Sequence, residues 1–205
     1  MSAKVTGATF CAVVAAAAVA SATWSDVAGR ASSGANGPTP LSAAVKKQLQ
    51  AAKAATAKYK DVAAAIADGY RAPPASAYEP EGHCAESPPD PRLQGYKGGG
   101  MGIHYDSAAL RAQAAKKGFD IRRPQQLNYI PVADKLRLVA IEFYKRDADQ
   151  NLATDDDRPT LFGQPFDGPM LGHYPGQPIH YDLHVWVFAH NPNGMFSTWN
   201  PSVHC

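Results

Sequence analysis

The sequence has no excess of charge of either sign. Its 205 residues include 20 Lys and Arg against 18 Asp and Glu, which gives a formal net charge of +2, and the basic residues are scattered along the chain. Domains that bind nucleic acid gather positive charge on one face, because contacts to phosphates supply much of their affinity. The sequence therefore predicts no nucleic-acid partner.

Long apolar runs are also missing, except for one at the N-terminus. Residues 8–20 follow Lys4 and lead into Ala20-Ser21-Ala22, a small-residue pattern that signal peptidase accepts. A transmembrane helix needs about 20 apolar residues, so this run is short for one. We expect residues 1–22 to be a cleaved signal peptide, with a retained anchor as the alternative. Cleavage predicts a protein that is secreted or in the cell envelope, without stable membrane insertion.

Two changes in composition divide the rest of the chain. Residues 23–40 are rich in Ser, Gly, Ala and Pro and have no hydrophobic period, which predicts a disordered tether. Residues 41–205 are enough for one domain with a real hydrophobic core and too few for two comfortable domains. We therefore expect a single folded domain from residue 41 to the end.

Cysteine is scarce, and one of the three cysteines, Cys11, lies in the predicted signal peptide. Export would leave Cys84 and Cys205 in an oxidising compartment, where a pair of thiols forms a disulfide. We therefore predict a bridge between Cys84 and Cys205. The alternative is a metal site built on His83-Cys84 and His204-Cys205, because each cysteine follows a histidine.

Hydrophobic periodicity predicts helices in the first part of the domain. Apolar residues recur at intervals of three and four over residues 41–70, which is typical of one long amphipathic helix. A shorter helix is predicted over residues 107–117, where Gly118 supplies the C-terminal stop. Between the two helices, residues 73–100 are rich in Pro and Gly and predict an irregular connection.

Alternation of apolar and polar residues predicts strands in the second part. Short strands are expected at 101–105 and 195–199, a hairpin at 127–132 and 136–145, and the strongest strand at 179–188. Helix first and strands in hairpin-like succession predict an α+β fold. We expect an antiparallel sheet with the long N-terminal helix and the shorter second helix packed on one face.

The candidate site lies on the strand at residues 179–188. Alternation places His180, Asp182 and His184 on one face of this strand and its apolar residues on the other. The tetrapeptide Ile-His-Tyr-Asp, found there and again at residues 103–106, adds His104. Glu142 is a single carboxylate on an otherwise apolar strand face, and burying it without a partner would be costly. We therefore expect Glu142 to have a partner.

Three imidazoles, or two with a carboxylate, are the usual ligands of a catalytic zinc, copper or non-haem iron ion. We predict one divalent transition metal ion held by His104, His180 and His184. Glu142 would be a fourth ligand or the catalytic general base, and Asp182 would orient an imidazole. The alternative is a polar core layer of hydrogen-bonded histidines that bind nothing.

Better-defined motifs for other chemistry are missing. The glycine-rich residues 98–102 lack the lysine of a phosphate-binding loop, and no serine lies in a nucleophile elbow. The acidic residues from Asp147 lack the glycine and final glutamate of a calcium loop. Residues 161–170 could line a cavity for a small apolar or aromatic ligand, with core packing as the alternative.

Several segments are distinctive as a set. They are Gly-Ile-His-Tyr at 102–105, Leu-Arg-Leu-Val-Ala-Ile-Glu-Phe at 136–143, the segment 161–170, His-Tyr-Asp-Leu-His-Val-Trp at 180–186, Asn200-Pro201 and Cys205. In these segments the chain resembles a family of small exported bacterial proteins of uncharacterised function. The resemblance spans the folded part, implies export and one compact domain, and assigns no role to any residue.

The sequence thus favours an exported protein with a His/Glu metal site on a sheet face, of hydrolase or oxygenase type if it is an enzyme. It leaves open whether the protein is an enzyme. One alternative is a non-catalytic exported module that binds a small apolar or aromatic molecule. Another is a cell-envelope interaction protein, which only the tether supports.

Overall fold

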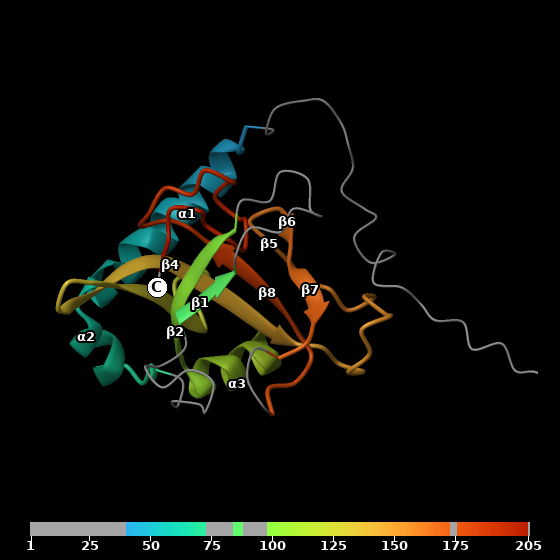
Figure 1. Cartoon of the computed structure of the whole chain (residues 1–205). Helices are drawn as coiled ribbons and strands as arrows, with labels where there is room; N and C mark the ends of the chain where they lie inside the picture. The colour runs from blue at the N-terminus through green and yellow to red at the C-terminus, as the bar shows by residue number, and fades with distance from the viewer. Residues whose placement is uncertain (1–39, 73–83, 88–97, 173–175, 205) are drawn as a thin grey trace, which may run out of the picture. The chain divides into compact units, whose positions relative to one another are not determined.

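The computed structural model describes residues 40–72, 84–87, 98–172 and 176–204 (Figure 1). All of these except Pro40 belong to one compact unit, Leu41–Cys205. The predicted signal peptide and all but the last residue of the predicted tether lie outside the described residues, so both stay predictions. Within the described part of the chain, no helix is long and apolar enough to cross a membrane.

The N-terminal helical segment is divided into three pieces. They are α1 (Ala43–Thr56), the 3-10 helix η2 (Ala57–Lys60) and α2 (Val62–Ala67). This differs from the single long helix that the periodicity predicts. At the break, Asp61 is extended and its side chain accepts a hydrogen bond of 3.0 Å from the Ala63 amide, which starts a new helix. The apolar spacing continues across the break, so periodicity alone does not reveal it.

The second helix, α3 (Ala108–Lys117), matches the prediction closely. The Ser107 side chain accepts a hydrogen bond from the Leu110 amide at its start, and Gly118 follows its last turn at a φ of 80°. A positive φ is easily reached only by glycine, so Gly118 ends the helix as the sequence predicts.

Most of the strands form one antiparallel sheet, which confirms the α+β class. Its six strands run in the order β1-β2-β3-β4-β8-β7, and β5 and β6 form a separate pair (Figure 1). The bounds are β1 (Cys84–Ser87), β2 (Gly99–Asp106), β3 (Gln126–Val132), β4 (Lys135–Arg146), β5 (Thr160–Leu161), β6 (Gln164–Pro165), β7 (Asp167–Met170) and β8 (His180–Val185). The predicted hairpin is β3 with β4.

Beyond β8 the chain does not form the predicted last strand at residues 195–199. The described residues there are turns, bends and one isolated bridge, in which Asn200 pairs with Gly100. The Met195 carbonyl instead accepts a hydrogen bond from the Trp186 amide. This segment therefore folds back beside the end of β8 without extending the sheet.

The core lies between the helices and one face of the sheet. Leu49 and Ala65 from the helices share one cluster with Leu183 of β8 and with the buried Phe162 and Phe166. For residues 161–170 the sequence allowed either a ligand cavity or core packing, and these two buried phenylalanines match core packing. On the opposite face, a smaller cluster holds Ile130, Val139, Ala140, Trp186 and Val203. This opposite face also presents the histidines.

Candidate metal centre

The strand register brings Glu142 and His184 together. β4 and β8 are antiparallel, and these two residues are direct partners in the pairing. Directly opposite residues in antiparallel strands project to the same face, with Cβ atoms about 5 Å apart. Glu142 is also the register partner of Gln126 on β3, and His104 on β2 pairs with Asn128, two residues further along β3. The neighbouring strands β2, β3 and β8 therefore each place a polar side chain close to Glu142 of β4 on the same sheet face.

Two histidine side chains converge on one carboxylate oxygen of Glu142. His104 Nε2 and His184 Nε2 each lie 3.1 Å from Glu142 Oε2. The ligand atoms of His104, Glu142 and His184 all lie within 4.8 Å of one another, so this group could hold a metal ion. Zinc binds such ligands at about 2.0–2.2 Å, which separates tetrahedral ligand atoms by about 3.3 Å. The two distances of 3.1 Å from the histidine nitrogens to Glu142 Oε2 are close to that value.

The group lies mostly inside the protein. The side chain of His184 is 0% exposed and that of Glu142 3%, whereas that of His104 is 18% exposed. A solvent molecule or small ligand would therefore approach from the side of His104. As expected for a buried carboxylate, Glu142 has partners, and the side-chain amide of Asn128 donates to its Oε2 at 2.9 Å.

The charges of this group shift its pKa values in opposite directions. Burial by itself would raise the pKa of Glu142, but His184 and His104 outweigh it and hold that pKa well below its ordinary value. Burial by itself would lower the pKa of His184, but Glu142 and Asp182 raise it well above its ordinary value. The metal-free centre therefore favours a carboxylate beside a protonated His184.

Unsatisfied polar atoms at the centre fit a metal ion. Among the described residues, both ring nitrogens of His184 and the Oδ1 of Asn128 are buried and make no well-directed hydrogen bond. A buried polar atom without a partner costs free energy, so such atoms require an explanation. An ion coordinated by the two Nε2 atoms and Glu142 would satisfy one of these nitrogens and leave coordination positions open.

His180 is not part of this group, contrary to its predicted role as a third ligand. Its ring stacks on Tyr144 with centroids 4.9 Å apart, and its Nδ1 lies 3.1 Å from the Pro178 carbonyl oxygen. His180 and His184 are on the same strand face, as alternation predicts. Four residues of strand nevertheless separate them by about 13 Å, which is too far for one shared ion.

Asp182 lies between the two histidines of β8. Its Oδ1 is 3.7 Å from His184 Nδ1, and its Oδ2 is 3.8 Å from His180 Nε2. The Nε2 of His184 faces Glu142 while its Nδ1 faces Asp182. This is the order of carboxylate, imidazole and metal in many metal sites, and it agrees with the predicted orienting role of Asp182.

Sequence reasoning did not identify Asn128. Its contact with Glu142 depends on the pairing of β3 with β4, including a register shift between Asn128 and Tyr129. The polar alternation of Gln126 and Asn128 in an otherwise apolar strand was the available signal. That alternation identifies a polar face, whereas the contact itself follows from the register.

The predicted disulfide falls partly outside the described residues. Cys84 begins β1, whereas His83 and Cys205 are not described. His204 Nδ1 lies 2.9 Å from Glu86 Oε1, so the end of the chain lies beside β1. Because Cys205 is not described, the pairing of Cys84 with Cys205 stays a prediction.

Comparison with known proteins adds no family to this description. The chain matches no protein-family model, no curated protein and no solved structure. Inferences about function therefore depend on the geometry of the centre and on the sequence.

Proposed function

We propose that this chain is an exported protein that binds one divalent transition metal ion, zinc, copper or iron, through His104, His184 and Glu142. The observation that supports this most directly is the position of two imidazole nitrogens, each 3.1 Å from one oxygen of a buried carboxylate. With two imidazoles in place of the three expected, Glu142 is proposed as a ligand and not as a general base. Such an ion supplies Lewis-acid or redox chemistry at its open positions.

The protein side of the centre has three tasks. Asn128 donates to Glu142 and fixes the carboxylate, while Asp182 Oδ1 faces the Nδ1 of His184 at 3.7 Å. Glu142 and His184 are shielded from solvent, while the partly exposed His104 leaves the group an approach from its side. A metal-dependent hydrolase or oxygenase would use all three features. A metal-binding protein without catalysis would need only the fixed carboxylate and the oriented imidazole.

Export is proposed from the N-terminal sequence. The charged start, the apolar run and Ala20-Ser21-Ala22 support cleavage after residue 22. Mass spectrometry of protein recovered from a bacterial culture tests this point, because the cleaved chain would begin at Thr23. An intact N-terminus on the recovered protein would contradict cleavage.

Metal content is the central test. The full chain, produced without a polyhistidine tag, is expected to contain about one zinc, copper or iron ion per chain by plasma mass spectrometry. His184→Ala is expected to reduce the metal content at least tenfold, because two ligands cannot hold the ion in competition with buffer. Removal of the ion with a chelator is expected to lower the melting temperature, and adding it back is expected to restore it.

Two matched variants make this test specific. His190→Ala removes an exposed histidine just beyond β8, and His180→Ala removes the histidine that the structure places outside the group. Both are expected to keep the full metal content. Metal-free wild type, with no change of melting temperature on adding each ion, would show that the histidines belong to a polar core layer. Loss of metal in His180→Ala with folding intact would contradict the proposed ligand set.

A further inference from the structure

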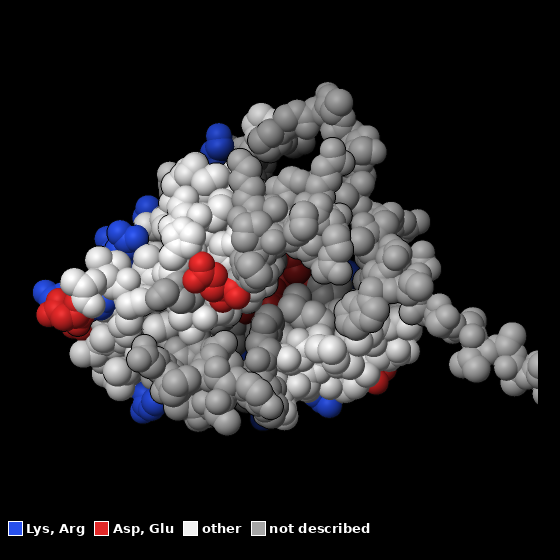
Figure 2. All heavy atoms as spheres, in the orientation of Figure 1, with Lys and Arg blue, Asp and Glu red and all other residues white. Residues whose placement is uncertain are grey.

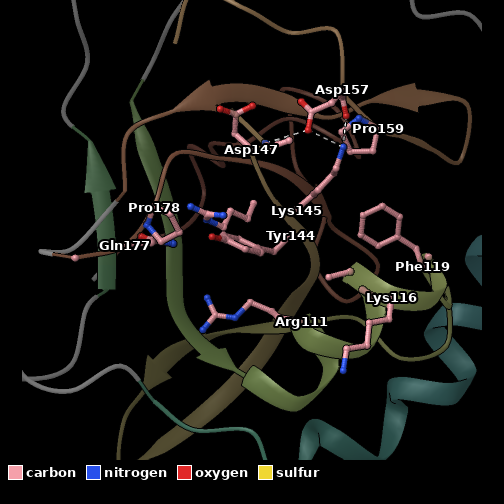
Figure 3. Close-up of a pocket in the computed structure, with 16 residues that line it drawn as sticks. Arg111, Lys116, Phe119, Tyr144, Lys145, Asp147, Asp157, Pro159, Gln177 and Pro178 are labelled. Atoms are coloured by element: carbon pink, nitrogen blue, oxygen red, sulfur yellow. Dashed lines mark hydrogen bonds and ion pairs between the residues drawn. The ribbon is translucent and has the colours of Figure 1, made fainter. Parts of the chain in front are cut away.

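A pocket lies at the end of β4, a few residues past Glu142 on the same strand. Its volume is about 840 Å³, and its walls come from α3, the end of β4 and residues 176–178 (Figure 3). Pockets for small molecules commonly measure about 300–1,000 Å³. The pocket therefore has room for a ligand the size of a metabolite.

Most of the pocket wall is apolar. Ala114 and Ala115 of α3 contribute methyl groups, and Pro159 and Pro178 contribute rings on the loop side. Tyr144 lies in the middle of the wall, with the Arg111 guanidinium 5.0 Å from its ring centroid and His180 stacked on it (Figure 3). These contacts occupy the faces of the Tyr144 ring and hold it in place, so the apolar surface offered to a ligand comes mainly from the alanines and prolines of the lining.

The charged residues of the lining are mainly basic. They are Arg111, Lys116, Lys145 and Arg146 against Asp147 and Asp157. Both acids already bind protein donors: Asp157 pairs with Lys145 at 3.0 Å, and Asp147 accepts from the Asn151 amide at 2.9 Å. Arg111 pairs with Asp106 at 3.0 Å. Asp147 keeps its negative charge, but the four basic residues of the lining outnumber the two acids, and Lys116 and the exposed Arg146 supply the positive excess that favours an anion.

We propose that this pocket binds a small aromatic carboxylate, whose ring packs on the apolar wall and whose anionic group meets Arg146. The proposal does not depend on the metal centre, since the lining contains none of its three ligands. The sequence already offered a small apolar or aromatic ligand as an alternative function. The present proposal places that ligand between α3 and β4 and gives it a negative charge.

A pair of probes that differ in one group tests the proposal. The full chain is titrated calorimetrically in the presence of a chelator with 1-naphthoate and with 1-naphthalenemethanol, which has the same ring but no charge. Naphthoate is expected to bind at least about tenfold more tightly, the effect of one charge-assisted hydrogen bond. Equal affinities of the two probes, or no binding of either, would overturn the proposal whatever the outcome for the metal.

Two variant pairs locate the binding. Ala115→Phe fills the pocket and is expected to weaken naphthoate binding at least tenfold, whereas Ala112→Phe, at another exposed position of α3 outside the lining, is expected to leave it unchanged. Arg146→Gln is expected to reduce the preference for naphthoate, and Arg137→Gln, exposed on the same strand, is not. Unchanged binding by Ala115→Phe, with the melting temperature of wild type, would also overturn the proposal.

Discussion

At the scale of single residues, Glu142 and His184 determine how protons compete with a metal ion. The carboxylate is buried beside two imidazoles, and Glu142 and His184 each stabilise the charged form of the other. A metal ion binds the unprotonated imidazole, which means that the proton on His184 must leave when the ion enters. The same electrostatic balance that stabilises the metal-free centre therefore opposes binding at low pH.

The metal affinity of wild type is expected to rise with pH near neutrality, by up to about tenfold per pH unit while one proton is displaced. The reason is the pKa of His184, which Glu142 and Asp182 raise well above 6.5 although burial opposes them. Calorimetry with one ion in buffers of different ionisation enthalpy measures the proton released. An affinity that does not change between pH 6 and pH 8 would be inconsistent with a protonated His184.

The chelated protein offers a second check of the same charges. The contribution of His184 to stability is complete below its unfolded pKa near 6.5 and is lost as the pH rises through its higher folded pKa. The contribution of Glu142 is present above 4.5 and is lost as the pH falls through its depressed folded pKa. The chelated wild type is therefore expected to be most stable between about pH 4.5 and 6.5, and Glu142→Gln is expected to flatten this profile in denaturant titrations.

At the scale of elements, alternation along a strand predicts which face of the sheet a side chain lies on, but not which side chains it contacts there. The placement of His180, Asp182 and His184 on one face of β8 is confirmed, and so is the packing of Leu183 in the core. Whether His180 or His104 joins His184 depends on the strand order and register, which arise from long-range pairing. The sequence predicted three histidine ligands, His104, His180 and His184, whereas the structure groups only His104 of β2 and His184 of β8 with Glu142.

The N-terminal helices show the corresponding limit for helical periodicity. A hydroxyl hydrogen bond from Tyr129 on β3 to the Tyr59 carbonyl oxygen, 2.6 Å long, engages a backbone group in η2. This tertiary contact lies beside the break at Asp61, and no pattern within residues 41–70 encodes it. The sequence does contain a local signal, because aspartate is a favourable N-cap residue.

Asp61→Ala is expected to lower the free energy of unfolding by about 1 kcal/mol, the usual effect of removing an N-cap side chain. The Asp61 carboxylate accepts from the Ala63 amide at 3.0 Å, and this hydrogen bond starts α2. Denaturant titration measures the loss. Asp156→Ala, at an exposed aspartate in the loop before β5, is the matched control and is expected to change stability by less than about 0.5 kcal/mol. Equal effects of the two substitutions would show that α2 does not depend on its cap.

At the scale of the whole molecule, the two ends of the folded unit are held differently. The N-terminal helices pack into the main core, whereas the C-terminal residues lie over the opposite sheet face, where Val203 is buried beside Gly100. The contact of His204 Nδ1 with Glu86 continues this path to β1, the edge strand that Cys84 begins. A bridge to Cys205 would close the path covalently and fix the segment that covers this face of the sheet.

Cys205→Ser is therefore expected to lower the free energy of unfolding by about 4–5 kcal/mol, the chain-entropy effect of opening a long loop. Cys84→Ser should have a similar effect, and the double variant should cost little more than either single variant, because both substitutions break the same bond. Denaturant titration of the three variants, with a thiol count in denatured, unreduced wild type, measures this directly. Reactive thiols from both cysteines in wild type, or a neutral Cys205→Ser, would contradict the bridge. In that case the C-terminal segment would be held to the sheet by the contacts of Val203 and His204 alone among those described.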